Sequence, residues 1–293
     1  MAGVDRTVIA HDGRTLAVQI AGDPEGKPVL VHMGTPNSRH LYGPNVADAE
    51  RRGLKLICHD RPGYGGSTPH PGRKVADCAD DVRAICETLD LDRIAVWGIS
   101  GGGPCSIACA ALLPDLVVAA ASLAAPAPYG AEGLDFFGGM GQGNVDDMQL
   151  MVDDRVAARS KLEKDREEFM ALSAGEVKDQ LQSLLCPADS ELLDGPMGEY
   201  LAYISKEGLA PGPEGWWDDS VSHMSRWGFE LADVSVPMLL LHGEQDRFVP
   251  FSHGRWLAEH IPGVEARLTS EDGHLTLLER RVAEVHSWLS ERL

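Results

Sequence analysis

Short apolar segments alternate with helical patterns along the first 125 residues, and this alternation restricts the fold more than any other feature of the chain. Apolar segments bounded by Gly and Pro lie at Pro28–His32 and Leu54–His59, with a helical stretch from about Leu41 to Arg52 between them. The pattern repeats through Ile94–Trp97 and Val117–Leu123. Because parallel strands need crossover connections, which are usually helices, this order predicts an α/β fold with a parallel sheet buried on both faces.

The N-terminal segments Thr7–Ala10 and Thr15–Ile20 flank the dipeptide Asp12-Gly13. Glycine reaches the positive φ that a tight turn requires, so this stretch is predicted to form a β-hairpin.

The alternation stops after Leu123. Strands are predicted again at Met238–Leu241 and Glu265–Thr269, followed by one closing helix from about Leu275 to Arg292. Residues 126–230 differ from the rest because they hold 21 acidic and 8 basic residues, a net of −13 out of the chain's −19. We expect a core domain made of residues 1–125 and 231–293, with residues 126–230 inserted as a cap.

Composition excludes several classes of partner. A net charge of −19 opposes binding to nucleic acid or anionic lipid. No apolar run approaches the roughly 20 residues of a membrane helix, and the charged N-terminus lacks the apolar region of a secretory signal, so a cytoplasmic location is predicted.

The six cysteines form no C-x-x-C pair and are expected to be reduced and mostly buried, with no metal site. The sequence leaves open whether the chain forms a homo-oligomer.

A possible nucleophile lies in Gly98-Ile99-Ser100-Gly101-Gly102, which matches G-x-S-x-G. The string follows the predicted strand Ile94–Trp97 and opens a helix, which is the setting of a nucleophile elbow. The sharp turn crowds the residues two before and two after the serine, and both are glycines here. The competing interpretation is a phosphate-binding turn, but no Lys follows the glycines and no G-x-G-x-x-G is present.

A serine hydroxyl needs a base, and a histidine base needs an acid to orient it. Among 11 histidines, His274 lies in a short loop between the last predicted strand and the last helix, at the same sheet edge as Ser100. Asp246 and Glu244 both follow the preceding strand and compete for the role of the acid. The expected oxyanion donors are the backbone N–H groups of Gly101 and Thr35.

These residues resemble the α/β-hydrolase superfamily, with the catalytic residues in the order Ser, Asp, His. Three further segments resemble the family's oxyanion loop, its D-x-x-G-x-G-x-S turn and its G-x-x-D-x-x-V-P acid loop. The resemblance implies an eight-stranded, mostly parallel sheet with helices on both faces and a mainly helical cap, and it favours Asp246 over Glu244. Met33 stands where the family usually has histidine, so support of the oxyanion loop is expected to differ. The three segments are Met33–Pro36, Asp60–Ser67 and Gly243–Pro250.

The resemblance implies a cofactor-free serine hydrolase acting on a small-molecule carboxylic ester or related acyl compound. Dehalogenases and epoxide hydrolases of the superfamily use Asp at the position of Ser100, which argues against both activities. The alternatives are a proline iminopeptidase-like aminopeptidase, haloperoxidase-like or perhydrolytic chemistry, and a non-catalytic ligand-binding protein. The candidate substrate-binding residues are Met33, Trp216, Trp217 and Trp227, although the tryptophans also suit the cap's own core.

Overall fold

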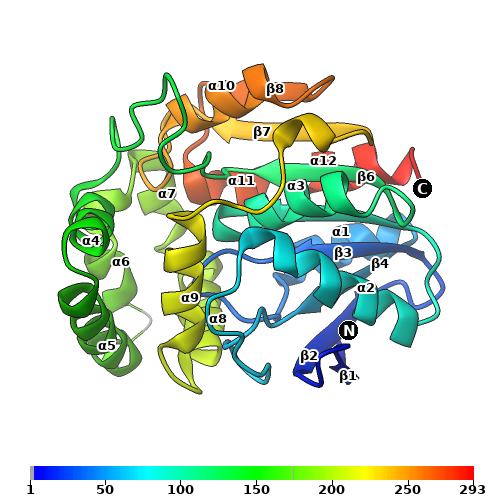
Figure 1. Cartoon of the computed structure of the whole chain (residues 1–293), viewed down its shortest axis with the longest axis horizontal. Coiled ribbons are helices and arrows are strands. Elements are labelled where there is room, and N and C mark those ends of the chain that lie inside the picture. Colours follow the sequence, from blue (N-terminus) through cyan, green and yellow to red (C-terminus); the bar gives the residue numbers. More distant parts are fainter. Residues whose placement is uncertain (1–2, 174) are drawn as a thin grey trace.

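An eight-stranded sheet runs through the protein in the order β1-β2-β4-β3-β5-β6-β7-β8 (Figure 1). The computed structural model describes residues 3–173 and 175–293. Strand β2 pairs antiparallel with β1 and β4, and the strands from β4 to β8 pair in parallel. The prediction of a mostly parallel α/β sheet is confirmed. The strands are β1 (Val4–Ile9), β2 (Thr15–Gly22), β3 (Lys27–His32), β4 (Leu54–His59), β5 (Ile94–Ile99), β6 (Val117–Leu123), β7 (Met238–Gly243) and β8 (Glu265–Thr269).

The predicted N-terminal hairpin is formed by β1 and β2, paired from Val4 with Ile20 to Ile9 with Thr15. Gly13 in its turn has a φ of +87°, which favours glycine. The first strand begins at Val4, three residues before the predicted Thr7, because pairing with β2 continues beyond the alternating segment.

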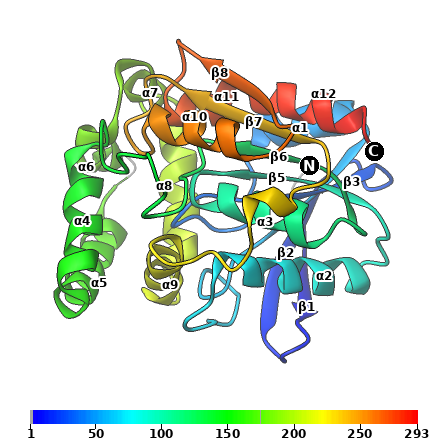
Figure 2. The same ribbon diagram turned by 45° about the horizontal axis from the view of Figure 1, so that its top comes forward.

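Helices cover both faces of the sheet, as predicted. Helices α2, α3 and α10 pack on one face, while α1, α11 and α12 pack on the other, and each side has its own apolar cluster (Figure 2). The predicted single closing helix is wrong. Two helices meet at Arg281, whose φ of −110° departs from helical values and whose guanidinium pairs with Asp272 at 2.7 Å. The helices are α1 (Gly43–Arg51), α2 (Cys78–Thr88), α3 (Gly103–Leu112), α10 (Phe251–His260), α11 (His274–Arg280) and α12 (Val282–Ser290).

A helical insertion, α4–α9, connects β6 to β7. Figures 1 and 2 show α4 and α5 side by side on its outer side, with α8 and α9 closer to the sheet. The helices are α4 (Gln142–Asp153), α5 (Arg155–Ala171), α6 (Glu176–Gln180), α7 (Pro187–Leu192), α8 (Pro196–Leu209) and α9 (Glu214–His223). The short 3₁₀ helices are η1 (Val75–Asp77), η2 (Ser100–Gly102), η3 (Gln182–Leu184) and η4 (Leu231–Asp233).

The cysteines are free and mostly buried, as the sequence predicts. All six cysteines are free thiols and five of them are buried. Among the helices of the described residues, none combines the length and apolar character that crossing a membrane would require.

Candidate active site

Ser100 follows β5 directly and opens the 3₁₀ helix η2, which leads into α3. Its φ is +54°, a left-handed conformation that is rare for a residue with a side chain. Gly98 and Gly102 leave no room for a side chain at their positions. A Cβ on Gly98 would collide with the carbonyl oxygen of Gly102, and a Cβ on Gly102 would collide with that of His32. The tight turn therefore places the Ser100 side chain at the carboxyl end of the sheet, where it lines a cavity.

Asp246 lies in the loop after β7 and His274 is the first residue of α11, which follows β8, and their side chains come together. His274 Nδ1 lies 2.7 Å from Asp246 Oδ2, and the Asp246 side chain is fully buried. The other oxygen of Asp246 accepts the backbone N–H groups of Phe248 and Val249, each at 2.9 Å. These bonds fix the carboxylate, which in turn fixes the ring so that Nε2 is available for proton exchange. Glu244 is exposed to solvent.

Several groups act on the protonation of His274. Burial lowers the pKa of His274, but the charge and hydrogen bond of Asp246 and the charge of Asp189 outweigh it, so the pKa stands above the ordinary value of 6.5. The ring of Phe248 stacks on His274 at 4.6 Å between centroids and 20° between planes. His242 Nε2 lies 3.7 Å from Asp246, but burial lowers the pKa of His242. The imidazole that gains a proton most readily beside Asp246 is therefore that of His274.

Asp189 is a buried residue of the insertion, and no local sequence pattern predicts a role for it in the site. Its Oδ2 accepts the N–H of His274 at 2.8 Å, and its Oδ1 accepts those of Leu275 and Thr276 at 2.9 Å each. These are the first three residues of α11. Because Gly273 has no side chain to cap the helix, Asp189 supplies the acceptor from a distant segment.

The loop after β3 faces the elbow at close range. A Cβ on Gly34 would lie 3.2 Å from the Cβ of Ser100. Within the described part of the chain, the Thr35 N–H donates no hydrogen bond, and Gly101 lies in the first turn of a helix, where N–H groups lack intrahelical acceptors. Arg61 donates to the carbonyl oxygen of Met33. Both predicted donors thus flank Ser100, and the loop that begins at Met33 is supported by an arginine.

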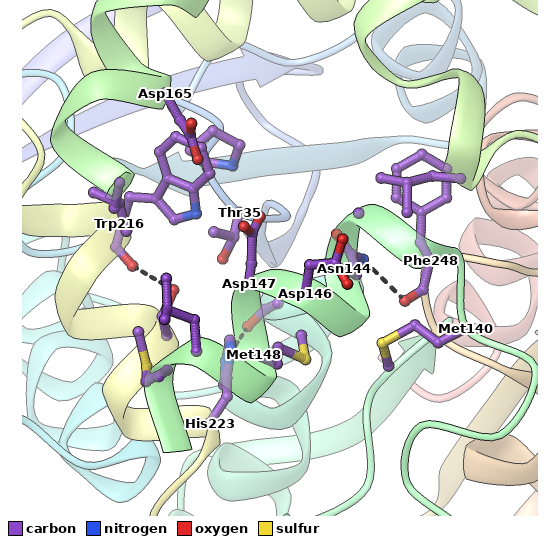
Figure 3. Close-up of a pocket in the computed structure, with 18 of the residues that line it drawn as sticks. Thr35, Met140, Asn144, Asp146, Asp147, Met148, Asp165, Trp216, His223 and Phe248 are labelled. Carbon is purple, nitrogen blue, oxygen red and sulfur yellow. Dashed lines mark hydrogen bonds between the residues drawn. The ribbon is translucent and has the colours of Figure 1, made fainter. Parts of the chain in front are cut away.

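A cavity of about 400 Å³ opens in front of Ser100, between the sheet edge and the insertion. Figure 3 shows residues that line it, among them Thr35, Trp216 and His223. Thr35 and Gly101 line it, together with Trp216 and His223 from α9. Its remaining wall is mainly apolar but carries four charged side chains, namely Asp146, Asp147, Lys161 and Asp165. Lys161 contacts both Asp147, at 2.6 Å, and Asp165.

The four predicted substrate-binding residues lie in different places. Trp216 lines the cavity. Met33 is 1% exposed and packs in the apolar cluster on one face of the sheet. The Trp217 ring packs against the guanidinium of Arg159 at 5.5 Å, and Trp227 is buried in the other cluster, stacked on Phe229. Of the four, only Trp216 lines the cavity.

Metal ligands are not gathered anywhere in residues 3–173 and 175–293: no three His, Cys, Asp or Glu side chains come together there as a possible site.

The sequence and fold resemble those of known hydrolases. A family model described as "alpha/beta hydrolase fold" matches residues 27–281. The AB hydrolase superfamily protein YisY of Bacillus subtilis (strain 168) is 28% identical over 274 residues, which cover 91% of each chain. The structure of a hydrolase from Pseudomonas aeruginosa PA01 gives a TM-score of 0.72 at 20% identity, covering 99% of this chain and 98% of that one, which establishes likeness of fold alone.

Two further relatives differ in the reactions that their names describe. A 2-hydroxy-6-oxononadienedioate/2-hydroxy-6-oxononatrienedioate hydrolase of Cupriavidus pinatubonensis is 24% identical, covering 93% of this chain and 90% of the relative. A bifunctional esterase/perhydrolase of Acinetobacter calcoaceticus is 25% identical, covering 83% of each chain.

Proposed function

This chain belongs to the α/β-hydrolase family, and we propose that it is a serine hydrolase that cleaves a carboxylic ester or a related acyl bond of a small molecule. One observation carries the proposal: a strained serine at the head of a helix lines the same edge of the sheet as a buried His–Asp pair joined at 2.7 Å. No metal or organic cofactor enters the proposed reaction.

In the proposed mechanism, the Ser100 hydroxyl attacks the substrate's carbonyl carbon while His274 Nε2 takes the hydroxyl proton. Asp246 keeps the ring oriented and stabilises the imidazolium. The negative charge that develops on the carbonyl oxygen is stabilised by the N–H groups of Thr35 and Gly101. His274 then protonates the leaving alcohol. Water, deprotonated by the same ring, attacks the acyl-enzyme and releases the acid.

We further propose that residues 126–230 act as a cap that selects the substrate. The insertion supplies most of the cavity wall, including all four charged side chains. Three of these are carboxylates and one is a lysine already paired with two of them. An anionic substrate would meet this net negative charge in a mainly apolar space, so neutral acyl groups are favoured. The dioate named for the Cupriavidus relative does not suit this cavity, whereas the esterase activity named for the Acinetobacter relative does.

The second candidate, an aminopeptidase, is favoured by the same carboxylates. Asp146, Asp147 and Asp165 could bind the protonated α-amino group of an aminoacyl substrate. Lys161 argues against the aminopeptidase, because it already forms ion pairs with two of the three carboxylates.

The test compares purified protein on p-nitrophenyl butyrate, on the p-nitrophenyl hemiester of succinic acid and on prolyl p-nitroanilide. We expect kcat/KM for the neutral ester to exceed that for the anionic hemiester by at least about tenfold. Ser100→Ala should abolish turnover, whereas Ser106→Ala, on the following helix, should retain it. Preference for the anilide would favour the aminopeptidase. Failure to turn over any acyl substrate would favour a non-catalytic binding protein.

A further inference from the structure

Two side chains of α9 contact Thr35 and Gly101, the two expected oxyanion donors. Asp219 and His223 stand four residues apart, one helical turn, and so lie on the same face of α9. Asp219 Oδ2 accepts the hydroxyl of Thr35 at 2.6 Å. His223 Nε2 lies 3.0 Å from the carbonyl oxygen of Gly101, and Figure 3 shows His223 beside the cavity. One helix of the insertion therefore contacts both residues whose N–H groups serve as oxyanion donors in the proposed mechanism.

Asp219 is held rigidly by several donors. The same Oδ2 accepts from Arg61 and from the hydroxyl of Tyr64 at 2.8 Å, while Oδ1 accepts from Arg73 at 2.8 Å. Burial alone would raise the pKa of Asp219, but the charges of Arg61 and Arg73 hold it far below its usual range. Asp219 is therefore a fixed carboxylate whose place is set from the core domain.

The same network reaches the backbone of the oxyanion loop. Arg61, paired with Asp219, also donates to the carbonyl oxygen of Met33 and to Thr35 Oγ1, the latter at 3.1 Å. The loop is thus held on both sides of Gly34, at the Met33 carbonyl and the Thr35 side chain. The position of the Thr35 N–H follows from these two anchors.

His223 fixes the second donor. Burial lowers the pKa of His223, so the ring is neutral near pH 7 and its Nε2–H donates to Gly101. The contact is tight, because a Cβ on Gly101 would collide with Thr35 Oγ1 and lie 3.1 Å from His223 Cε1. Holding the carbonyl of Gly101 restricts rotation of the residue whose N–H is the other oxyanion donor.

We propose that α9 sets the geometry of the oxyanion hole, with Asp219 and His223 as positioning residues, so that the insertion is required for turnover and not only for substrate choice. The inference rests on the proposed hydrolase function. Catalytic donors must be held within about 0.5 Å of the productive geometry, and loops alone rarely achieve this.

The experiment uses Asp219→Asn, Thr35→Val and His223→Phe. Thr35→Val removes the hydroxyl that donates to Asp219 and accepts from Arg61, and leaves the buried ion pairs of Asp219 intact. This variant therefore tests the inference even if Asp219→Asn does not fold. Asp218→Asn is the matched control, because Asp218 is also buried and contacts Arg73 at 3.2 Å without reaching Thr35. Ser222→Ala is the control for His223→Phe. His223→Gln retains a donor and should restore activity.

Active sites are first counted by complete reaction with a fluorophosphonate, and kcat is expressed per titrated site. We expect kcat to fall about 10- to 100-fold in the three variants with KM within about threefold. The affinity for a trifluoromethyl ketone, which forms a tetrahedral adduct on the serine, should weaken by the same factor. Both controls should match wild type in all three measurements.

Unchanged kcat per site and unchanged ketone affinity, with only thermal stability lowered, would overturn the inference and leave α9 as an anchor of the insertion. A wild type that neither reacts with the fluorophosphonate nor turns over any ester would instead overturn the proposed function, and this inference with it. The two failures are thus distinguished by the wild-type protein alone.

Discussion

Asp189 lies on α7 of the insertion, and its carboxylate accepts the first three backbone N–H groups of α11, from His274, Leu275 and Thr276, at 2.8–2.9 Å. Asp189→Ala leaves these buried donors without an acceptor. An unsatisfied buried donor costs about 1–3 kcal/mol, and because water can enter the truncated side chain's space we take the lower end for each. The loss is then about 3 kcal/mol, or a fall in Tm of about 6 °C for a chain of this size.

Asp189→Asn separates the charge from the hydrogen bonds. The asparagine oxygen can still accept from Leu275 and Thr276, so the loss of stability should be smaller than for alanine. The charge of Asp189 favours protonated His274 and raises its pKa. Without that charge the pKa of His274 should fall, and the acid limb of kcat/KM should move to lower pH.

The assay is kcat/KM for a neutral ester from pH 5 to 9, with Tm measured in parallel. Asp194→Asn is the control, because Asp194 is exposed and pairs with Lys178 at 2.7 Å. An acid limb unchanged in Asp189→Asn, together with a wild-type Tm in Asp189→Ala, would refute the reasoning.

Three other predictions follow from the site and the core. Asp246→Asn should lower kcat about 10³- to 10⁴-fold by disturbing the ring's tautomer, while Glu244→Gln should change it little; equal effects would contradict the assignment of the acid. Trp216→Ala should raise KM several-fold, and Trp217→Ala should not, as steady-state kinetics would show. Burial lowers the pKa of His253 to about 4, so as pH falls below 6.5 the unfolded state takes up a proton before the folded state does. This difference should lower the free energy of unfolding by about 2 kcal/mol by pH 5. In urea unfolding at several pH values, His253→Asn should lose less stability between pH 7 and pH 5 than wild type, by about that amount.

Much of the fold could be predicted from local sequence patterns. The succession of strands and helices along the core could be predicted because its central strands, such as β3, β5 and β7, are short apolar runs with glycine or proline beside them. The turn at Ser100 was predictable because Gly98 and Gly102 meet a steric demand that acts within five residues. The break at Arg281 was missed, because the ion pair joins Arg281 to Asp272, which lies before the predicted helix and outside its pattern.

The supports of the site could not be predicted in the same way. Asp189, Asp219 and His223 each contact a residue far away in the sequence, at separations of 85, 184 and 122 positions respectively. Nothing in their own sequence neighbourhood distinguishes them from the other polar residues of the insertion. Tryptophan presents a similar problem. Trp216 and Trp227 are the same residue type in the same acidic segment, but one lines the cavity and the other packs in the core. Tertiary packing alone decides between these roles.

An activated Ser100 is the central claim, and mass spectrometry after treatment with a fluorophosphonate tests it most directly. Wild type should carry a single adduct on Ser100, and both Ser100→Ala and His274→Ala should carry none, since the serine reacts only when the histidine takes its proton. No adduct on wild type, or an adduct on another residue, would contradict the account and favour a protein that binds its ligand without turning it over.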